Sequence, residues 1–247
     1  MCCPNTCAQV FKHCQEIGSI QRRSNIAGKG VNERLSYVFK ITSDESLKKG
    51  LIEAVKIISE GGIVAFPTES FYGLGVDATN TDAVQNLFKI KGRDHNAPIL
   101  ILISSFRNLP QYVADIPPKA KRLGKKFWPG GLTMVFQSSS VLSSALTSNT
   151  GKVGIRISSH PLANALSNTL NVPITATSAN ISGMPPCVKA DQVVEYFNNA
   201  VDLILDGGET QGKCPSTILD VTIDPPLIIR EGMIKVEELI NHLTNSG

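Results

Sequence analysis

Polar side chains gather in this sequence where apolar runs end or begin. Residues 67–75 carry two aliphatic hydroxyls, one carboxylate and two glycines directly after the apolar run 63–66. Ser178 and Asn180 follow a second apolar run in the same way, and Ser216 precedes a third. Open α/β sheets bind ligands at the carboxyl ends of their strands, so these residues could line one small-molecule site. Ordinary turn chemistry explains each cluster equally well when it is taken alone.

Three cations lie in comparable places and suit an anionic ligand. Lys91 and Arg93 flank Gly92 just beyond an expected helix, where positive charge also stabilises the helix C-terminus. Arginine offers a planar fork and lysine a point charge, so the two could clamp a phosphate or a carboxylate. Arg230 ends an apolar run and should either pair with an acid, for which Glu231 is available, or bind an anion.

Several common kinds of site are not supported by the sequence. The run 207–213 fits the first part of a phosphate-binding P-loop, but Cys214 stands where that motif needs Ser or Thr. No G-x-G-x-x-G follows a strand, and no G-x-S-x-G elbow is present. The four histidines form no metal-binding pattern. We therefore expect neither a metal site nor a covalent nucleophile.

The basic charge of the chain is concentrated at its N-terminus. The net charge is +3, but residues 1–42 hold six cations and two acids, a net of +4, and residues 43–247 hold 18 cations and 19 acids, a net of −1. We expect residues 1–42 to be a disordered N-terminal extension. A transit peptide and a zinc site are the alternatives, although the four cysteines of this segment include no C-x-x-C pair.

Residues 43–247 alternate helix and strand patterns. Apolar residues make up 42% of the 247-residue chain, and no run approaches the ~18 apolar residues of a membrane-spanning helix. The expected helices are 44–60, 81–90, 118–127, 162–170, 190–198 and 236–243. The expected strands are 63–66, 99–103, 132–136, 153–157, 174–177, 201–205, 217–221 and 227–229. Because several strands are apolar on both faces, we predict an α/β domain with one twisted sheet covered by helices.

The expected helix 118–127 carries five cations and no acid. A solvated helix face is the simpler interpretation of this pattern. A surface that contacts RNA phosphates is the alternative, since clustered lysine and arginine neutralise the phosphate backbone.

Taken in order, these motifs resemble those of the YrdC/Sua5 family of threonylcarbamoyl-AMP synthases. The resemblance covers roughly residues 47–240. It rests on the segments 67–75, 91–93, 127–133, 153–156, 178–180, 216–220 and 229–232. It implies a short member of the family with a single YrdC-like domain at 43–247. The implied fold is a three-layer, RibB-like α/β fold, with a mixed twisted sheet around a concave, positively lined cavity.

The resemblance also implies a reaction, in which L-threonine, bicarbonate and ATP give threonylcarbamoyl-AMP and pyrophosphate. The product would serve N6-threonylcarbamoylation of adenosine 37 in tRNA by a separate transferase complex. The implied catalytic residues are Lys91, Arg93, Ser178 and Asn180. The implied ATP-binding residues are Lys91, His95, Asn180 and Arg230, and the implied threonine-binding residues are Thr68, Arg156, Ser178 and Ser216. Mg²⁺ would accompany the triphosphate through phosphate oxygens and water.

Small departures from the family pattern leave some roles open. Ser70 replaces the usual threonine and keeps a hydroxyl, whereas Asp94 and His95 stand where a proline is common, so the role of His95 is open. Two other functions remain as alternatives: an RNA-binding module without catalysis, and a carbamoyl-adenylating enzyme similar to a domain of hydrogenase maturation proteins. We expect a cytoplasmic protein without membrane contact, with tRNA or double-stranded RNA as a further candidate partner.

Overall fold

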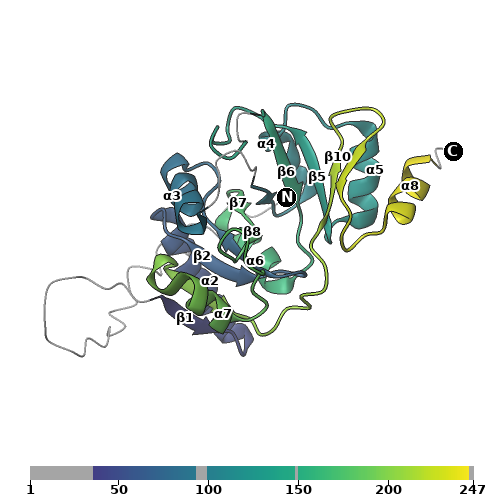
Figure 1. The fold of residues 1–247 in the computed structure, drawn as a ribbon. Coiled ribbons are helices and arrows are strands. Elements are labelled where there is room, and N and C mark those ends of the chain that lie inside the picture. Colours follow the sequence, from purple (N-terminus) through teal and green to yellow (C-terminus); the bar gives the residue numbers. More distant parts are fainter. Residues whose placement is uncertain (1–35, 93–98, 148–149, 245–247) are drawn as a thin grey trace, which may run out of the picture. The chain divides into compact units, whose positions relative to one another are not determined.

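The computed structural model describes residues 36–92, 99–147 and 150–244 of the chain. Contacts divide the chain into residues 1–33 and 34–247, and every described residue belongs to the second unit (Figure 1). The strands are β1 (Tyr37–Lys40), β2 (Val64–Pro67), β3 (Tyr72–Gly75), β4 (Ile101–Leu102), β5 (Leu132–Gln137), β6 (Lys152–Arg156), β7 (Ile174–Thr175), β8 (Thr177–Ser178), β9 (Leu203–Asp206), β10 (Thr217–Asp220) and β11 (Leu227–Arg230). The helices are α2 (Asp44–Ser59), α3 (Thr81–Lys91), α4 (Leu109–Tyr112), α5 (Pro118–Phe127), α6 (Pro161–Leu170), α7 (Ala190–Phe197) and α8 (Val236–Thr244), with short 3-10 turns at Phe106–Asn108 and Asn198–Ala200.

The first sheet has its strands in the order β1-β9-β2-β3-β8 and is covered by helices on both faces. β1 and β2 run parallel to β9, whereas β3 runs antiparallel to β2 and β8. Leu203 and Leu205 of β9 belong to the apolar cluster of α2 and α6, and Ile204 between them belongs to the cluster that includes α7. Successive side chains of a strand point to opposite faces, which explains why β9 is apolar throughout.

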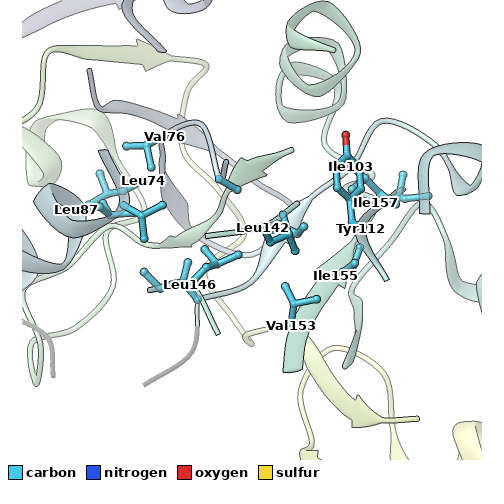
Figure 2. Packing of buried hydrophobic residues seen from close by; sticks show 14 of the residues in the cluster. Leu74, Val76, Leu87, Ile103, Tyr112, Leu142, Leu146, Val153, Ile155 and Ile157 are labelled. Atoms are coloured by element: carbon cyan, nitrogen blue, oxygen red, sulfur yellow. The ribbon is translucent and has the colours of Figure 1, made fainter. Parts of the chain in front are cut away.

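The second sheet has the order β11-β10-β5-β6-β4-β7 and is also mixed. β5 pairs in parallel with β10 and antiparallel with β6. One face packs on the main core (Figure 2). This core contains Val153 and Ile155 of β6, Leu142 and Leu146 of the loop between β5 and β6, and Tyr112 of α4. Helices α5 and α8 contribute to the same core. The residues between these core positions point to the opposite face.

The chain changes sheets within residues 174–178. The sequence predicts one strand here, but the structure has β7, which pairs with β4 of the second sheet, and β8, which pairs with β3 of the first. Ala176, between them, donates its N–H to the carbonyl of Leu100 at 2.9 Å. The predicted mixed α/β fold with flanking helices is therefore confirmed, but the strands form two sheets and not one.

The folded unit begins earlier in the chain than predicted. β1 lies within the predicted extension 1–42, yet it pairs with β9 from Tyr37 opposite Leu203 to Lys40 opposite Asp206. Helix α2 lies close to this part of the chain, because a Cβ atom on Gly50 would come within 2.8 Å of the Ile41 side chain. The start of the folded body thus moves upstream to β1, and residues 1–35 lie outside the described part.

Most helix boundaries agree with the local sequence signals. Ser43 caps α2 as predicted, since its hydroxyl accepts the N–H of Ser46 at 3.2 Å. Helix α5 has the predicted bounds, and it buries Leu123 and Phe127 while its lysines face outward. In the described ranges, no helix has the length and apolar character needed to cross a bilayer.

Candidate functional site

A cavity of about 690 Å³ lies on the face of the second sheet that the main core leaves uncovered. Residues of β3 and β8 from the first sheet and of β5, β6, β10 and β11 from the second line it. Its floor contains Thr133, Val135, Gly154 and Ile218, which alternate with core residues along their strands. A Cβ atom on Gly154 would come within 3.2 Å of the Thr133 methyl group, so the lack of a side chain at this position leaves space in the cavity. The lining thus combines the apolar Val135 and Ile218 with polar side chains such as Ser178, Ser216 and Arg230.

The turn between β2 and β3 is held by the hydroxyl of Thr68. This hydroxyl donates to the carbonyl of Phe71 at 2.7 Å, accepts the N–H of Ser70 at 3.2 Å and lies 3.1 Å from the Ser70 hydroxyl. Thr68 is buried, whereas Ser70 lines the cavity. The turn therefore presents the Ser70 side chain to the cavity with Thr68 directly behind it.

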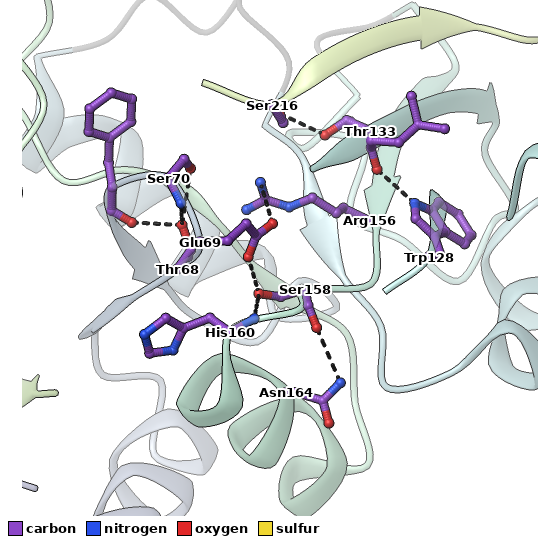
Figure 3. A network of polar contacts seen from close by, with 12 residues as sticks. Thr68, Glu69, Ser70, Trp128, Thr133, Arg156, Ser158, His160, Asn164 and Ser216 are labelled. Atoms are coloured by element: carbon purple, nitrogen blue, oxygen red, sulfur yellow. Dashed lines mark hydrogen bonds and ion pairs between the residues drawn. The ribbon is translucent and has the colours of Figure 1, made fainter. Parts of the chain in front are cut away.

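A buried ion pair lies beside this turn (Figure 3). The Nη1 atom of Arg156, on β6, lies 3.1 Å from Oε1 of Glu69, and the Ser158 hydroxyl donates to the other carboxylate oxygen at 2.5 Å. Burial lowers the pKa of the Arg156 guanidinium, and the Glu69 carboxylate opposes that effect. Glu69 thus helps to keep a deeply buried guanidinium charged.

The Ser178–Asn180 segment is fixed from below by Lys91. The Lys91 ammonium, in the last turn of α3, donates to the carbonyls of Ser178 and Asn180 at 2.5 and 2.7 Å and lies 3.3 Å from Oδ1 of Asn180. The Ser178 hydroxyl donates to the same Oδ1 at 2.6 Å. Ser178 and Asn180 line the cavity, and the buried Lys91 places a positive charge beneath them.

Arg230 reaches the cavity from β11 and is anchored on Ser216. Its Nη2 and Nε atoms donate to the Ser216 carbonyl at 2.9 and 3.2 Å, and the Thr133 hydroxyl donates to the Ser216 hydroxyl at 2.9 Å. Burial lowers the pKa of Arg230, and the nearby charge of Arg156 lowers it further. The positive charges of Arg156 and Arg230 disfavour each other, and an anion bound between them would be stabilised by both.

A second ion pair lies elsewhere on the cavity lining. Nζ of Lys152, on β6, lies 2.8 Å from Oδ2 of Asp220, on β10. Asp220 also accepts the hydroxyl and the N–H of Thr222 at 2.6 and 2.9 Å. Among the described residues, no group of three or more His, Cys, Asp or Glu side chains could hold a metal ion.

The structure brings most of the predicted site residues together. Ser178, Asn180, Ser216 and Arg230 line the cavity, and the buried Thr68, Lys91 and Arg156 lie next to lining residues or act on them. Arg93 and His95 lie outside the described residues, so their predicted roles stay predictions. The sequence analysis did not single out Glu69, Ser158, Lys152 or Asp220 as site residues. Glu69 and Asp220 lie within the motif segments, which could have indicated them, whereas Lys152 and Ser158 lie outside those segments.

Comparisons with known proteins give matches over most of this chain. Residues 56–232 match the Sua5_yciO_yrdC family model, whose description is telomere recombination. A threonylcarbamoyl-AMP synthase of Pyrococcus abyssi is 41% identical over 75% of this chain and 55% of its own length. A relative from Mycobacterium tuberculosis is 33% identical over 83% of this chain and 94% of its own length.

A solved structure shares the fold as well. The crystal structure of P. abyssi Sua5 complexed with L-threonine matches with a TM-score of 0.79 at 36% identity, covering 85% of this chain and 61% of that one. This chain spans little more than half the length of the P. abyssi relative. The family match extends from α2 to beyond Arg230 and thus contains every wall of the cavity. With its cavity, its motifs and its relatives in agreement, this chain belongs to the Sua5/YciO/YrdC family.

Proposed function

We propose that this chain is an L-threonylcarbamoyladenylate synthase, a nucleotidyltransferase that converts L-threonine, bicarbonate and ATP to threonylcarbamoyl-AMP and pyrophosphate. The observation that supports the proposal best is that Ser178, Ser216 and Arg230 line one cavity, with the buried guanidinium of Arg156 close enough to affect the pKa of Arg230. The similar proteins named threonylcarbamoyl-AMP synthase, and the relative solved with L-threonine, support the identity of the reaction and of this substrate.

Threonine would bind at the buried end of the cavity. A guanidinium and a carboxylate form short, charge-assisted hydrogen bonds, so Arg156 is suited to the threonine carboxylate. Ser216 and Ser178 offer hydroxyls to the amine or hydroxyl of the amino acid, and Thr68 supports this wall through Ser70. The roles of Arg156, Ser178 and Ser216 are those that the family resemblance implies, whereas the resemblance implies a direct contact between Thr68 and threonine.

ATP would bind across the opening toward Arg230. Arg230 and Asn180 can donate to phosphate oxygens from the cavity lining, and Lys91 adds positive charge from beneath the 178–180 segment. Arg93 and His95 complete the proposed ATP-binding set. Mg²⁺ would arrive with the triphosphate and would be held mainly by phosphate oxygens and water.

The reaction needs no protein nucleophile. The threonine nitrogen bonds to the carbon of bicarbonate with loss of water, which gives a carbamate. A carbamate oxygen then bonds to the α-phosphorus of ATP, and the bond from that phosphorus to the pyrophosphate oxygen breaks. The protein would contribute positioning, charge neutralisation and exclusion of water from the product anhydride.

The wider role follows from the product. Threonylcarbamoyl-AMP would supply the N6-threonylcarbamoyl group for adenosine 37 of tRNA, through a separate transferase complex in the cytoplasm. Direct contact with tRNA or double-stranded RNA would use the exposed cations of α5. Four of its residues, Lys121, Arg122, Lys125 and Lys126, are exposed, and such a cluster neutralises phosphates.

The test is pyrophosphate release by the purified protein with ATP and Mg²⁺. L-threonine and bicarbonate are added separately and together, with L-serine in place of threonine as the control. We expect release that requires both substrates and prefers threonine. Release with carbamoyl phosphate in place of threonine and bicarbonate would instead indicate a carbamoyl-adenylating enzyme. No release under any combination would leave RNA binding as the remaining function.

A further inference from the structure

The carboxylate of Glu69 has no role in the reaction described above, yet it is built into the buried wall of the site. Its side chain is 8% exposed and comes from the turn between β2 and β3, whereas Arg156 comes from β6 of the other sheet. One carboxylate oxygen contacts Nη1 of Arg156 at 3.1 Å, and the other accepts the Ser158 hydroxyl at 2.5 Å. Both oxygens of Glu69 therefore have defined neighbours.

The loop that carries Ser158 is itself fixed. The Ser158 hydroxyl accepts the N–H of His160 at 3.2 Å, and its carbonyl accepts Nδ2 of Asn164 from α6 at 3.2 Å. His160 caps α6, with Nδ1 accepting the N–H of Leu162 at 3.3 Å. Glu69 is thus held from the N-terminus of α6, and its position does not depend on Arg156 alone (Figure 3).

The guanidinium of Arg156 retains unused hydrogen-bonding capacity. Its Nε is buried without a hydrogen-bond partner among the described residues, and Oε1 of Glu69 likewise makes no well-aligned hydrogen bond. A buried donor without a partner destabilises the folded state, and a ligand that accepted a hydrogen bond from it would remove that effect. The contact with Glu69 lies at the Nη1 end of the guanidinium, and Nε is the donor that a ligand could satisfy.

We propose that Glu69 is a positioning residue that fixes the Arg156 guanidinium, through the Glu69–Ser158 contact, in the orientation that receives the carboxylate of the substrate amino acid. This inference rests on the proposed function, since it names what orients the threonine-binding arginine. The pair also joins the two sheets, because Glu69 lies in the turn between β2 and β3 and Arg156 lies on β6. Arg156 touches the substrate in this scheme, and Glu69 acts only through Arg156.

Two possible roles of Glu69, neutralising Arg156 and orienting it, predict opposite effects of its removal on threonine binding. If Glu69 merely neutralised Arg156, its removal would leave more positive charge in the cavity and the threonine carboxylate would bind more tightly. If Glu69 orients Arg156, its removal weakens binding, because the guanidinium loses its fixed geometry. In Glu69→Gln, Ser158 can still donate to the side-chain oxygen, but the amide group then faces Nη1 of Arg156, donor against donor.

The experiment compares the full-length wild type with Glu69→Gln by calorimetric titration of L-threonine and by steady-state pyrophosphate release. We expect the dissociation constant and KM for threonine to rise, and kcat/KM for threonine to fall about 10- to 100-fold. Glu45→Gln, which removes an exposed carboxylate paired with Lys49 on α2, is the matched control and should leave all three unchanged. Tighter threonine binding, or no change in a folded Glu69→Gln protein, overturns the proposal.

A double-mutant cycle separates positioning from simple structural damage. If Glu69 acts through Arg156, then Glu69→Gln should add little to the loss already caused by Arg156→Lys. Additive losses overturn the proposal. Thermal unfolding reports whether Glu69→Gln folds, and if it does not, Ser158→Ala replaces it, with an expected loss of threonine affinity of about 3-fold in the same direction. An inactive wild type would refute the proposed function instead, which is a different result from an active wild type with an unaffected variant.

Discussion

Lys91 combines a proposed catalytic charge with a structural task. It is 2% exposed, and its ammonium supplies hydrogen bonds to the carbonyls of Ser178 and Asn180. We expect Lys91→Met to abolish pyrophosphate release and also to lower the free energy of unfolding by about 1–3 kcal/mol, because two carbonyls lose a charged donor. Activity assays and urea unfolding measure the two effects. Lys89→Met, on the exposed side of the same turn of α3, is the control and should change neither pyrophosphate release nor the free energy of unfolding. A folded Lys91→Met protein with wild-type turnover would refute the role of Lys91.

At the residue scale, the sequence is informative about residue types and much less so about partners. The hydroxyls, amide and cations of the motifs are recognisable from their places at strand ends, and the structure brings seven of the predicted residues to one cavity or its wall. The contact of Ser158 with Glu69 joins residues 89 positions apart, and that of Thr133 with Ser216 joins residues 83 positions apart. No periodicity specifies such pairs, because the first joins the two sheets and the second joins neighbouring strands that are far apart in the sequence.

At the scale of elements, helices were easier to predict than strands because their signals are local. The cap at Ser43 and the proline start of α5 fix two helices almost to the residue. The sequence predicts no strand at β3, whose two glycines weaken a strand and are also typical of a turn. Its Gly75 is required by packing, since a Cβ atom there would lie 2.5 Å from the Ile174 side chain. Tertiary contact, and not propensity, makes this segment a strand.

β1 gives a prediction about where the folded body begins. We expect a variant that starts at residue 43 to be less stable than one that starts at residue 36, by about 2 kcal/mol, because it loses the pairing with β9 and the partly buried Phe39 and Ile41. In a chain of this size, that loss corresponds to a fall in Tm of about 4–8 °C. Thermal unfolding of the two truncated proteins measures the difference. Equal Tm values would show that β1 contributes nothing to stability and that the boundary at residue 42 was correct.

At the scale of the whole folded unit, the site depends on how two mixed sheets meet. The chain crosses between them at Ala176, and the Glu69–Arg156 pair joins the turn of one sheet to a strand of the other. The division of eleven strands between two sheets follows from pairing partners far apart in the sequence, as with β10 beside β5. Local sequence patterns do not indicate which strands pair. The fold class could therefore be predicted from the sequence, but the number of sheets could not.

The Lys152–Asp220 pair connects strands that lie on either side of β5, so it links the stability of the second sheet to pH. Burial raises the pKa of Asp220, but hydrogen bonds from Lys152 and Thr222 outweigh burial, and the pKa lies below its ordinary value. A carboxyl group with a lowered pKa in the folded state stabilises the protein above its unfolded pKa of about 4. It loses that contribution as the pH falls through the folded value.

Asp220→Asn should therefore lower the free energy of unfolding by roughly 1–3 kcal/mol at pH 7, and the gap from the wild type should close as the pH falls below about 4. Urea unfolding at pH 7, 5, 4 and 3 measures this gap. Asp224→Asn is the control, because Asp224 pairs with Lys119 while its side chain is 80% exposed, and a surface pair of this kind contributes about 0–1 kcal/mol. A gap for Asp220→Asn that stays constant down to pH 3 would mean that the side chain acts by its shape and hydrogen bonds to Thr222. The ion pair between Asp220 and Lys152 would then contribute nothing to the free energy of unfolding.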